Sequence, residues 1–378
     1  MSEFLFELYS EEIPSNLQIS AREEIKEKLE KSLLDQSIKV KEISAYSCPT
    51  RITIFIKDLP VQINIPSKEV RGPKVGVIDD ILNNFIRAHK STKKDLFKKN
   101  TEKGDFYFLK TLPSIVEVKD LVMKNLLNII SSIKWKKSMR WADTTLIWAR
   151  PLRSIYATFN GKLLLFNFGH LRSTNNIIAE RDLTKNIKKI SSFKEYKNFL
   201  RKNNIIFDHN ERENIILKKF KQICSKKNLS EKYNPVTLKE VINLVDNPNI
   251  FLVNFDKKYL EIPKEIIIST LESHQRYFPL FDQKDQLTNN FFVVSNKADK
   301  DNLIKDGNKK VVEARLSDAM FFWKKDKSKN LIKQISKLKK ITFYDKLGTV
   351  YDKSIRIKQL AGYLSDDLNI SKEKVEIA

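Results

Sequence analysis

The stretch SIYATFNGKLLLFNF, residues 154–168, constrains the fold of this chain more than any other local signal. Asn160-Gly161 stands in its middle, between two runs rich in β-branched and aromatic residues. Because the tightest hairpin turns need positive φ angles, Asn-Gly is a preferred sequence for them. The stretch therefore predicts two neighbouring antiparallel strands.

The rest of the chain mixes strand and helix patterns, which predicts an α+β fold. Strands are expected at FLFELY (4–9), and at IKVKEISAYS and RITIFIKDL on either side of Cys48-Pro49. Apolar residues at helical spacing predict helices over 15–35 and 115–133. Strands are expected again at NIFLVNF, RYFPLFD and NNFFVVSN, Pro263 suits the first turn of a short helix, and the chain is expected to be helical from Asn308 on.

At 378 residues the chain is too long for one ordinary core, so two or three domains are expected. The apolar pattern breaks at KKDKSKN, which predicts a boundary near 326–332. We therefore predict a mixed α/β region over 1–326, with a Lys-rich helical insertion over about 184–247. A helical region is predicted to begin at 327.

The charge of the chain favours a polyanionic partner. Lys and Arg number 70 against 47 Asp and Glu, a net charge of +23. Basic side chains that neutralise RNA phosphates release counterions, which favours binding. A general bias of the coding sequence towards Lys, Asn and Ile explains the same excess, so charge alone leaves both explanations open.

The compartment is expected to be the cytoplasm. No run approaches the ~20 apolar residues that a membrane-spanning helix needs, and the acidic start MSEFLFELYSEE differs from a secretory signal. Cys48 and Cys224 lie far apart without a Cys-x-x-Cys partner, so both are expected to be reduced thiols.

Familiar catalytic motifs are absent from the sequence. It contains no Gly-x-Gly-x-x-Gly, no P-loop, no His-Glu-x-x-His and no metal-ligand spacing. The residues alone therefore nominate no catalytic residue and no metal site, and the candidates that remain are residues suited to binding.

Two basic stretches are candidates for RNA contact. SMRW (138–141) and WARPLR (148–153) place Arg140, Arg150 and Arg153 beside Trp141 and a second tryptophan. Arg next to aromatic rings suits RNA stacking, and it suits structural cation–π packing equally well.

RGPKVG (71–76) is predicted to be a loop, and Asp79 or Asp80 is expected to cap the helix that follows. Such a loop can aim its backbone N–H groups and Lys74 at a phosphate, with Arg71 beside them. A plain loop is the alternative.

ESHQRYFPLF (272–281) carries one of only four histidines. His274 and Arg276 precede a predicted strand, where they suit a cap or hydrogen-bonding hub better than a general base, because no carboxylate is adjacent to His274 in the sequence. Farther on, Arg315 and Asp318 are spaced for a modest helix-surface ion pair. The neighbouring Phe321 and Phe322 are expected to pack in the core.

Taken in order, these stretches resemble the beta subunit of the bacterial, heterotetrameric type of glycyl-tRNA synthetase. The stretches that carry the resemblance are FLFELYSEEIPS, RGPKVG, SMRWADTTLIWARPLRSIYATFNGK, VINLVDNPNIFLVNFDKKYLEIPKEII, ESHQRYFPLFD, NFFVVSN, GNKKVVEARLSDAMFFWKKD and KLGTVYDKSIRI. They run from about residue 3 to residue 360. No single stretch is diagnostic, but the ordered series is specific.

The resemblance implies a division of labour between two subunits. The alpha subunit is expected to hold the class II core that uses ATP, magnesium and glycine, so no cofactor is expected on this chain. The beta subunit is expected to bind and position the glycine tRNA within an alpha2-beta2 heterotetramer. It also implies an N-terminal α/β region related to the tRNA-editing-like module of phenylalanine-type synthetases. The start of an all-helical HD-like domain is expected to follow over 327–378, and to be incomplete.

Two departures from the family are visible. Family members are much longer and end in an anticodon-binding domain, so we expect a chain that stops at Ala378 to be a fragment or a truncated product. Where family members commonly show Gly-His-Arg-Phe, this chain reads IIAERDL (177–183), and only Arg181 is kept. A stand-alone RNA-binding module and a hydrolase that edits mischarged tRNA remain as rival functions.

Overall fold

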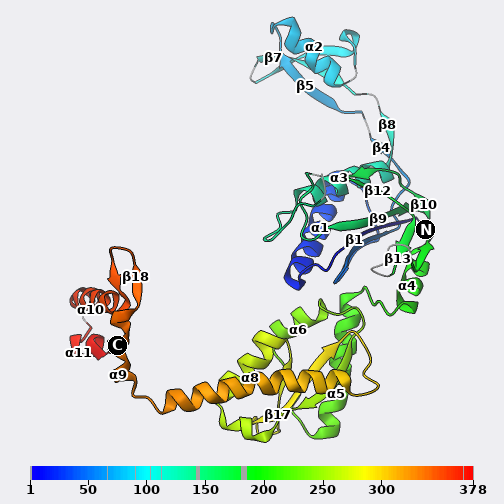
Figure 1. Cartoon of the computed structure of the whole chain (residues 1–378). Helices are drawn as coiled ribbons and strands as arrows, with labels where there is room; N and C mark the ends of the chain where they lie inside the picture. Colours follow the sequence, from blue (N-terminus) through cyan, green and yellow to red (C-terminus); the bar gives the residue numbers. More distant parts are fainter. Residues whose placement is uncertain are drawn as a thin grey trace.

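The computed structural model describes residues 2–65, 67–89, 91–102, 104–111, 113–141, 145–179, 185–368 and 370–377. Its first unit is built on a five-stranded antiparallel sheet (Figure 1). In spatial order its strands are β10 (Lys162–Leu163), β9 (Leu152–Phe159), β1 (Glu3–Ser10), β3 (Arg51–Lys57) and β2 (Glu42–Cys48). The strands predicted from FLFELY, RITIFIKDL and SIYATF are confirmed, and IKVKEISAYS forms a strand from Glu42 on.

Both faces of this sheet are covered, which explains why β1 is buried along almost its whole length. The predicted helix over 15–35 is α1 (Ser15–Asp35), and it packs with α3 (Val118–Ser132) on the face that carries Phe4 and Phe6. On the opposite face, α4 (Phe193–Lys202) and the strands β13 (Asn176–Ile178) and β14 (Ile187–Lys189) cover Leu5 and Tyr156. A strand buried on both faces has a nearly continuous apolar sequence, as FLFELY does.

The predicted hairpin at Asn160-Gly161 is confirmed, because these two residues join β9 to β10 with φ angles of 48° and 72°. A Cβ added at Gly161 would lie 2.6 Å from the carbonyl oxygen of Ser191, so the turn requires glycine for space as well as for conformation. A smaller hairpin of β11 (Asn167–Phe168) and β12 (Leu171–Arg172) follows.

A second, smaller unit is inserted between β3 and α3. Its two ends form the paired strands β4 (Gln62–Ile65) and β8 (Ser114–Glu117), from which it projects away from the first sheet (Figure 1). The unit contains the sheet β5–β7–β6 (Glu69–Lys74, Gly104–Lys110 and Leu96–Thr101), helix α2 (Asp79–Ala88) and a 3-10 turn, η1 (Lys93–Asp95).

Two predictions were wrong in this unit. The predicted loop at RGPKVG begins as strand, because a bulge between Arg71 and Lys74 accommodates the Gly-Pro pair within β5. Asp79 and Asp80 lie in the first turn of α2 rather than at its cap, where Ile78 stands. The helix predicted over 115–133 is confirmed as α3, which begins at Val118 because the preceding residues pair with β4.

The third unit is a sheet between helices. Its strands are β15 (Asn249–Asn254), β17 (Leu287–Ser295) and β16 (Phe278–Phe281), as NIFLVNF, NNFFVVSN and RYFPLFD predicted. One face packs on α5 (His209–Lys227) and α6 (Pro235–Ile242) through Phe220 and Phe292. The other packs on α7 (Lys264–Ser269) and α8 (Leu303–Lys327), with the turn η2 (Lys257–Glu261) and the π-helix η3 (Thr270–His274) beside it.

Beyond α8 lies a largely helical segment. It comprises α9 (Leu331–Gln334), η4 (Ile335–Lys340), β18 (Thr342–Tyr344), β19 (Gly348–Thr349), α10 (Val350–Asp367) and α11 (Lys372–Ile377). The α+β class is thus confirmed, whereas the editing-like module, the HD-like domain and the domain boundaries stay predictions. Among the described residues, no helix is long and apolar enough to cross a membrane.

Candidate functional site

The nine residues predicted as RNA contacts or scaffold lie in three separate places. Arg71 and Lys74 are on β5 of the inserted unit. Four others, Arg140, Trp141, Arg150 and Arg153, precede or begin β9 in the first unit. The last three, His274, Arg276 and Arg315, lie around the π-helix of the third unit. The structure therefore brings together the members of each group, but it does not join the groups in one pocket.

The tryptophans of the second group have structural contacts. Trp148 is completely buried, and its ring meets Trp135 edge to face with 4.7 Å between centroids. Its backbone pairs with Met139, which ties the two basic stretches together. Trp141 is only half-buried and meets His170 edge to face at 5.8 Å. Trp148 therefore belongs to the core, while Trp141 lies at its edge.

The three arginines of this group differ in what they contact. Arg153 donates from Nη1 to Glu11 Oε1 at 2.7 Å, an ion pair that joins β9 to the turn after β1. Arg150 donates to the carbonyl of Ala149 at 3.1 Å. Arg140 is exposed. Arg153 is thus a scaffold residue, and Arg140 is the member of this group most accessible to a partner.

Arg276 holds the junction between η3 and β16. It adopts a left-handed conformation, with φ of 59°, and its guanidinium donates to the carbonyl oxygens of Glu272 and Ser273. It also forms an ion pair with Glu240 of α6. A cation that donates to the last carbonyls of a helix stabilises that helix end. His274 is exposed at the same end.

Arg315 reaches this junction from α8. With the Gln275 amide oriented so that its oxygen faces α8, that oxygen accepts from Arg315 Nε at 2.8 Å and from Nη2 at 3.2 Å. Arg315 and Asp318 are both exposed. The expectation that Phe321 and Phe322 pack in the core was wrong, because they are 60% and 57% exposed near the end of α8.

A buried ion pair in the first sheet was missed. Arg51 and Glu7 are 1% and 2% exposed, and Arg51 Nη1 donates to Glu7 Oε1 at 2.8 Å. Tyr196 donates to the other Glu7 oxygen at 2.5 Å, and burial together with the Glu7 carboxylate raises the pKa of Tyr196 well above its usual value. The signal was a glutamate inside the apolar strand FLFELY, since such a residue is buried only with a partner.

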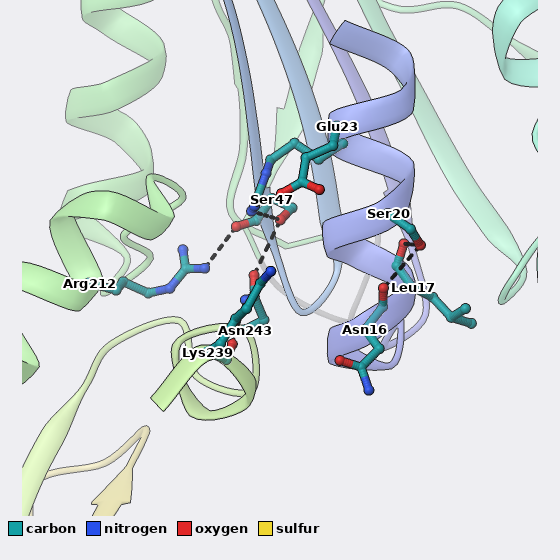
Figure 2. A network of polar contacts seen from close by, with 9 residues as sticks. Asn16, Leu17, Ser20, Glu23, Ser47, Arg212, Lys239 and Asn243 are labelled. Carbon is teal, nitrogen blue, oxygen red and sulfur yellow. Dashed lines mark hydrogen bonds and ion pairs between the residues drawn. The ribbon is translucent and has the colours of Figure 1, made fainter. Parts of the chain in front are cut away.

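A polar network joins the first and third units (Figure 2). Arg212 of α5 is fully buried and donates from Nη2 to the Ser47 carbonyl of β2 at 2.8 Å. Its Nε donates to the Ile242 carbonyl of α6 at 2.7 Å. The Ser47 hydroxyl accepts from Arg22 of α1 at 3.0 Å and donates to Asn243 Oδ1 at 3.4 Å. These bonds satisfy polar groups at a buried junction and so fix how the two units pack.

His209 lies at the start of α5, close to this network. Its Nδ1 atom is buried and has no hydrogen-bond partner within the described ranges. Burial, followed by the charges of Arg22 and Arg212, lowers the pKa of His209 to about 3. The imidazole is therefore neutral at physiological pH.

A polar cavity of about 540 Å³ opens between the first and third units. Its lining includes Arg51, Asn203, Asp246, Asn296 and Lys297. These amide, carboxylate and ammonium groups can hydrogen-bond a polar molecule. In the cavity, as in the rest of the described ranges, no group of three His, Cys, Asp or Glu side chains is arranged to hold a metal ion. Arg181, the residue kept from the Gly-His-Arg-Phe stretch, lies outside the described residues.

Comparison with known proteins gave a consistent result. A family model described as "Glycyl-tRNA synthetase beta subunit" matches residues 4–378. The chain is 35% identical over 371 residues to the glycine–tRNA ligase beta subunit of Rickettsia felis, covering 97% of this chain and 56% of that protein. It is 36% identical over 369 residues to the same subunit of Rickettsia prowazekii, covering 97% and 55%. The chain thus spans about half the length of the curated relatives it matches.

Proposed function

The chain belongs to the glycyl-tRNA synthetase beta subunit family, and from this premise we propose that it takes part in the ATP-dependent attachment of glycine to its tRNA. In this proposal it binds and positions the tRNA and contacts a catalytic alpha subunit, in a cytoplasmic complex with two copies of each subunit. The match of the family description across residues 4–378 is the observation that carries the proposal.

The chemistry in this proposal belongs to the alpha subunit, which uses ATP, magnesium and glycine. This chain contributes binding energy, because holding the acceptor end of a tRNA beside an activated amino acid replaces a bimolecular encounter with an oriented one. The net charge of +23 supports tRNA as the partner. The rival function of a tRNA-editing hydrolase gains no support from His274, which is exposed and whose neighbours in the sequence, Ser273 and Gln275, are not carboxylates.

The exposed members of the three groups are the best candidates for tRNA contact. Arg71, Lys74, Arg140 and Arg315 are exposed, as is His274. Arg153 and Arg276 are committed to ion pairs within the chain, so we assign them scaffold roles. Arginine suits phosphate more specifically than lysine does, because its planar fork donates two parallel hydrogen bonds.

Association tests this proposal directly. The purified chain is mixed with the alpha subunit of the same organism, and sedimentation is followed with and without a glycine tRNA transcript. We expect a complex of the two subunits, and tRNA affinity that falls steeply as salt is raised from about 50 to 200 mM.

The control is a tRNA of different identity at equal concentration. The alpha subunit with this chain should retain the glycine tRNA in preference to the control at about 150 mM salt. Absence of a complex with the alpha subunit, together with equal binding of the two tRNAs, would support the stand-alone RNA-binding module instead.

A further inference from the structure

One face of the inserted sheet gathers aromatic and basic side chains. In the pairing of β5 with β7, Arg71 lies opposite Phe108 and Lys74 opposite Phe106. In the pairing of β6 with β7, Phe97 lies opposite Phe108 and Lys99 opposite Phe106. Directly paired residues share a face of a sheet, as do alternate residues of one strand. We call the face that carries these six residues, Arg71, Lys74, Phe97, Lys99, Phe106 and Phe108, the aromatic face.

The core of the inserted unit uses the opposite face. There Leu109 is 1% exposed and pairs with Val70 and Leu96. Helix α2 packs against β5, where Phe85 lies against Gly72, and its Leu82 and Ile86 are buried. The three phenylalanines of the aromatic face remain only half-buried. Since the core is built without them, their gathering on the other side needs a different explanation.

Cations lie against these rings. The Arg71 guanidinium carbon is 3.6 Å from the centroid of Phe106. The Lys99 ammonium is 5.6 Å from the centroid of Phe108 and is ion-paired with Glu69 at 2.9 Å. Phe97 and Phe108 stack with centroids 6.0 Å apart. Lys74 packs over Gly104, because a Cβ added at Gly104 would lie 3.2 Å from Lys74 Cε. Arg71 and Lys74 are exposed, so the guanidinium plane that covers Phe106 still presents its outer side to solvent.

Charge indicates the kind of partner. Residues 67–111 hold eleven Lys and Arg against six Asp and Glu, a net charge of +5. Bases stack on aromatic rings and on guanidinium planes displayed by a sheet, while lysines contact the phosphates between them. A protein partner of the same size would have to cover these cations with matching carboxylates. The combination of open rings with a positive charge therefore fits a polyanion that has flat groups.

We propose that the aromatic face binds unpaired nucleotides of an RNA. One base stacks on Phe108, a second stacks on the guanidinium of Arg71, and Lys74 contacts the backbone. In the cell this RNA is the glycine tRNA, and that step rests on the proposed function. RNA binding by the aromatic face does not depend on the proposed function, because any unpaired RNA presents the same bases and phosphates.

The test uses the full chain with Phe106→Leu and Phe108→Leu, which keep an apolar side chain but remove the ring. Two probes are titrated: a glycine tRNA transcript, and a single-stranded oligoribonucleotide of about 12 nucleotides that carries 2-aminopurine, whose fluorescence is quenched on stacking. We expect each variant to weaken binding of both probes about tenfold and to reduce the quenching. The slope of log affinity against log salt should stay unchanged, because no cation is lost.

Matched variants separate stacking from charge. Arg71→Lys should weaken binding and keep the salt slope, whereas Arg71→Gln should also reduce the slope by about 0.7. Phe321→Leu, which removes an exposed ring from α8, should leave both affinities unchanged. The far-ultraviolet circular dichroism of every variant should match that of the parent, because the buried core lies on the other face.

The outcomes distinguish this proposal from the proposed function. If the parent binds the oligoribonucleotide but not the tRNA, and the leucine variants lose that binding, the aromatic face stands and the proposed function fails. If the leucine variants fold but keep the parent's affinity and quenching, RNA binding by the aromatic face is overturned and the proposed function stands. The same holds if these variants lose binding to the alpha subunit while their RNA binding is intact. If the parent binds neither probe, both proposals are overturned.

Discussion

Replacing Arg51 by Met should destabilise the first unit strongly, because the change leaves a buried carboxylate without its cation. Arg51 and Glu7 are 1% and 2% exposed and are joined at 2.8 Å. Breaking a buried ion pair by removing one partner costs about 3–5 kcal/mol, chiefly through the unpaired charge left behind. We expect the free energy of unfolding of the first unit to fall by about that amount in Arg51→Met.

Removal of both charged groups should cost much less than the sum of the single changes. In Glu7→Leu with Arg51→Met no charge remains buried, and Tyr196 keeps its hydrogen bond to Thr53 Oγ1 at 2.8 Å. The apolar replacements also avoid the desolvation of two ions. The double-mutant cycle should therefore give a coupling energy of at least about 2 kcal/mol.

Urea unfolding followed by tryptophan fluorescence measures these quantities for the first unit. Trp135, Trp141 and Trp148 belong to or border its core. Trp323 on α8 is replaced by Phe in every variant, so that the signal comes from the first unit. Because the chain has several units, the unfolding transition of the first unit is fitted separately from those of the others. A cost below about 1 kcal/mol for Arg51→Met, or single costs that simply add, would refute the reasoning.

Three further changes test other parts of the structure. Burial and neighbouring arginines hold the pKa of His209 at about 3, against 6.5 ordinarily, so between these pH values the unfolded chain takes up a proton that the folded chain does not. The free energy of unfolding should therefore fall as pH drops from about 6.5 towards 3. Urea titrations at successive pH values should show a flatter decline for His209→Gln. Gly161→Ala should cost about 1–2 kcal/mol in urea unfolding, through the positive φ and the contact with Ser191, whereas an unchanged midpoint would contradict the described hairpin. Arg276→Met should cost about 1 kcal/mol in thermal unfolding by removing the helix-end bonds and the pair with Glu240, while a change to Lys should recover part of that loss.

Local signals predicted the elements of the fold well. Asn160-Gly161 predicted its hairpin, because the φ angles that this turn needs are a property of those two residues. FLFELY and NNFFVVSN predicted strands, and the structure places both between two neighbouring strands of their sheets, where apolar side chains are needed on both faces. The bulge that admits Gly72-Pro73 to β5 was not predictable, because it depends on pairing with a strand about thirty residues later.

The candidate site was harder to predict because its contacts are distant in sequence. The sequence left RNA contact and structural packing equally open for Arg153, and the fold decides between them by placing Glu11 within 2.7 Å. Arg212 lies in a Lys-rich helix, and nothing local marks it as the buried donor to Ser47. The aromatic face was hidden for the same reason, because its residues come from three strands and gather only when the register is known.

The central claim is tested most directly by charging tRNA with glycine. The alpha subunit is assayed alone and with this chain, with radioactive glycine, ATP, magnesium and a glycine tRNA transcript, and with ATP omitted as the control. The account predicts that the alpha subunit alone charges tRNA poorly, and that this chain raises the ATP-dependent rate in proportion to the complex formed. No increase in charging, although this chain and the alpha subunit form a complex that binds the tRNA, would contradict it.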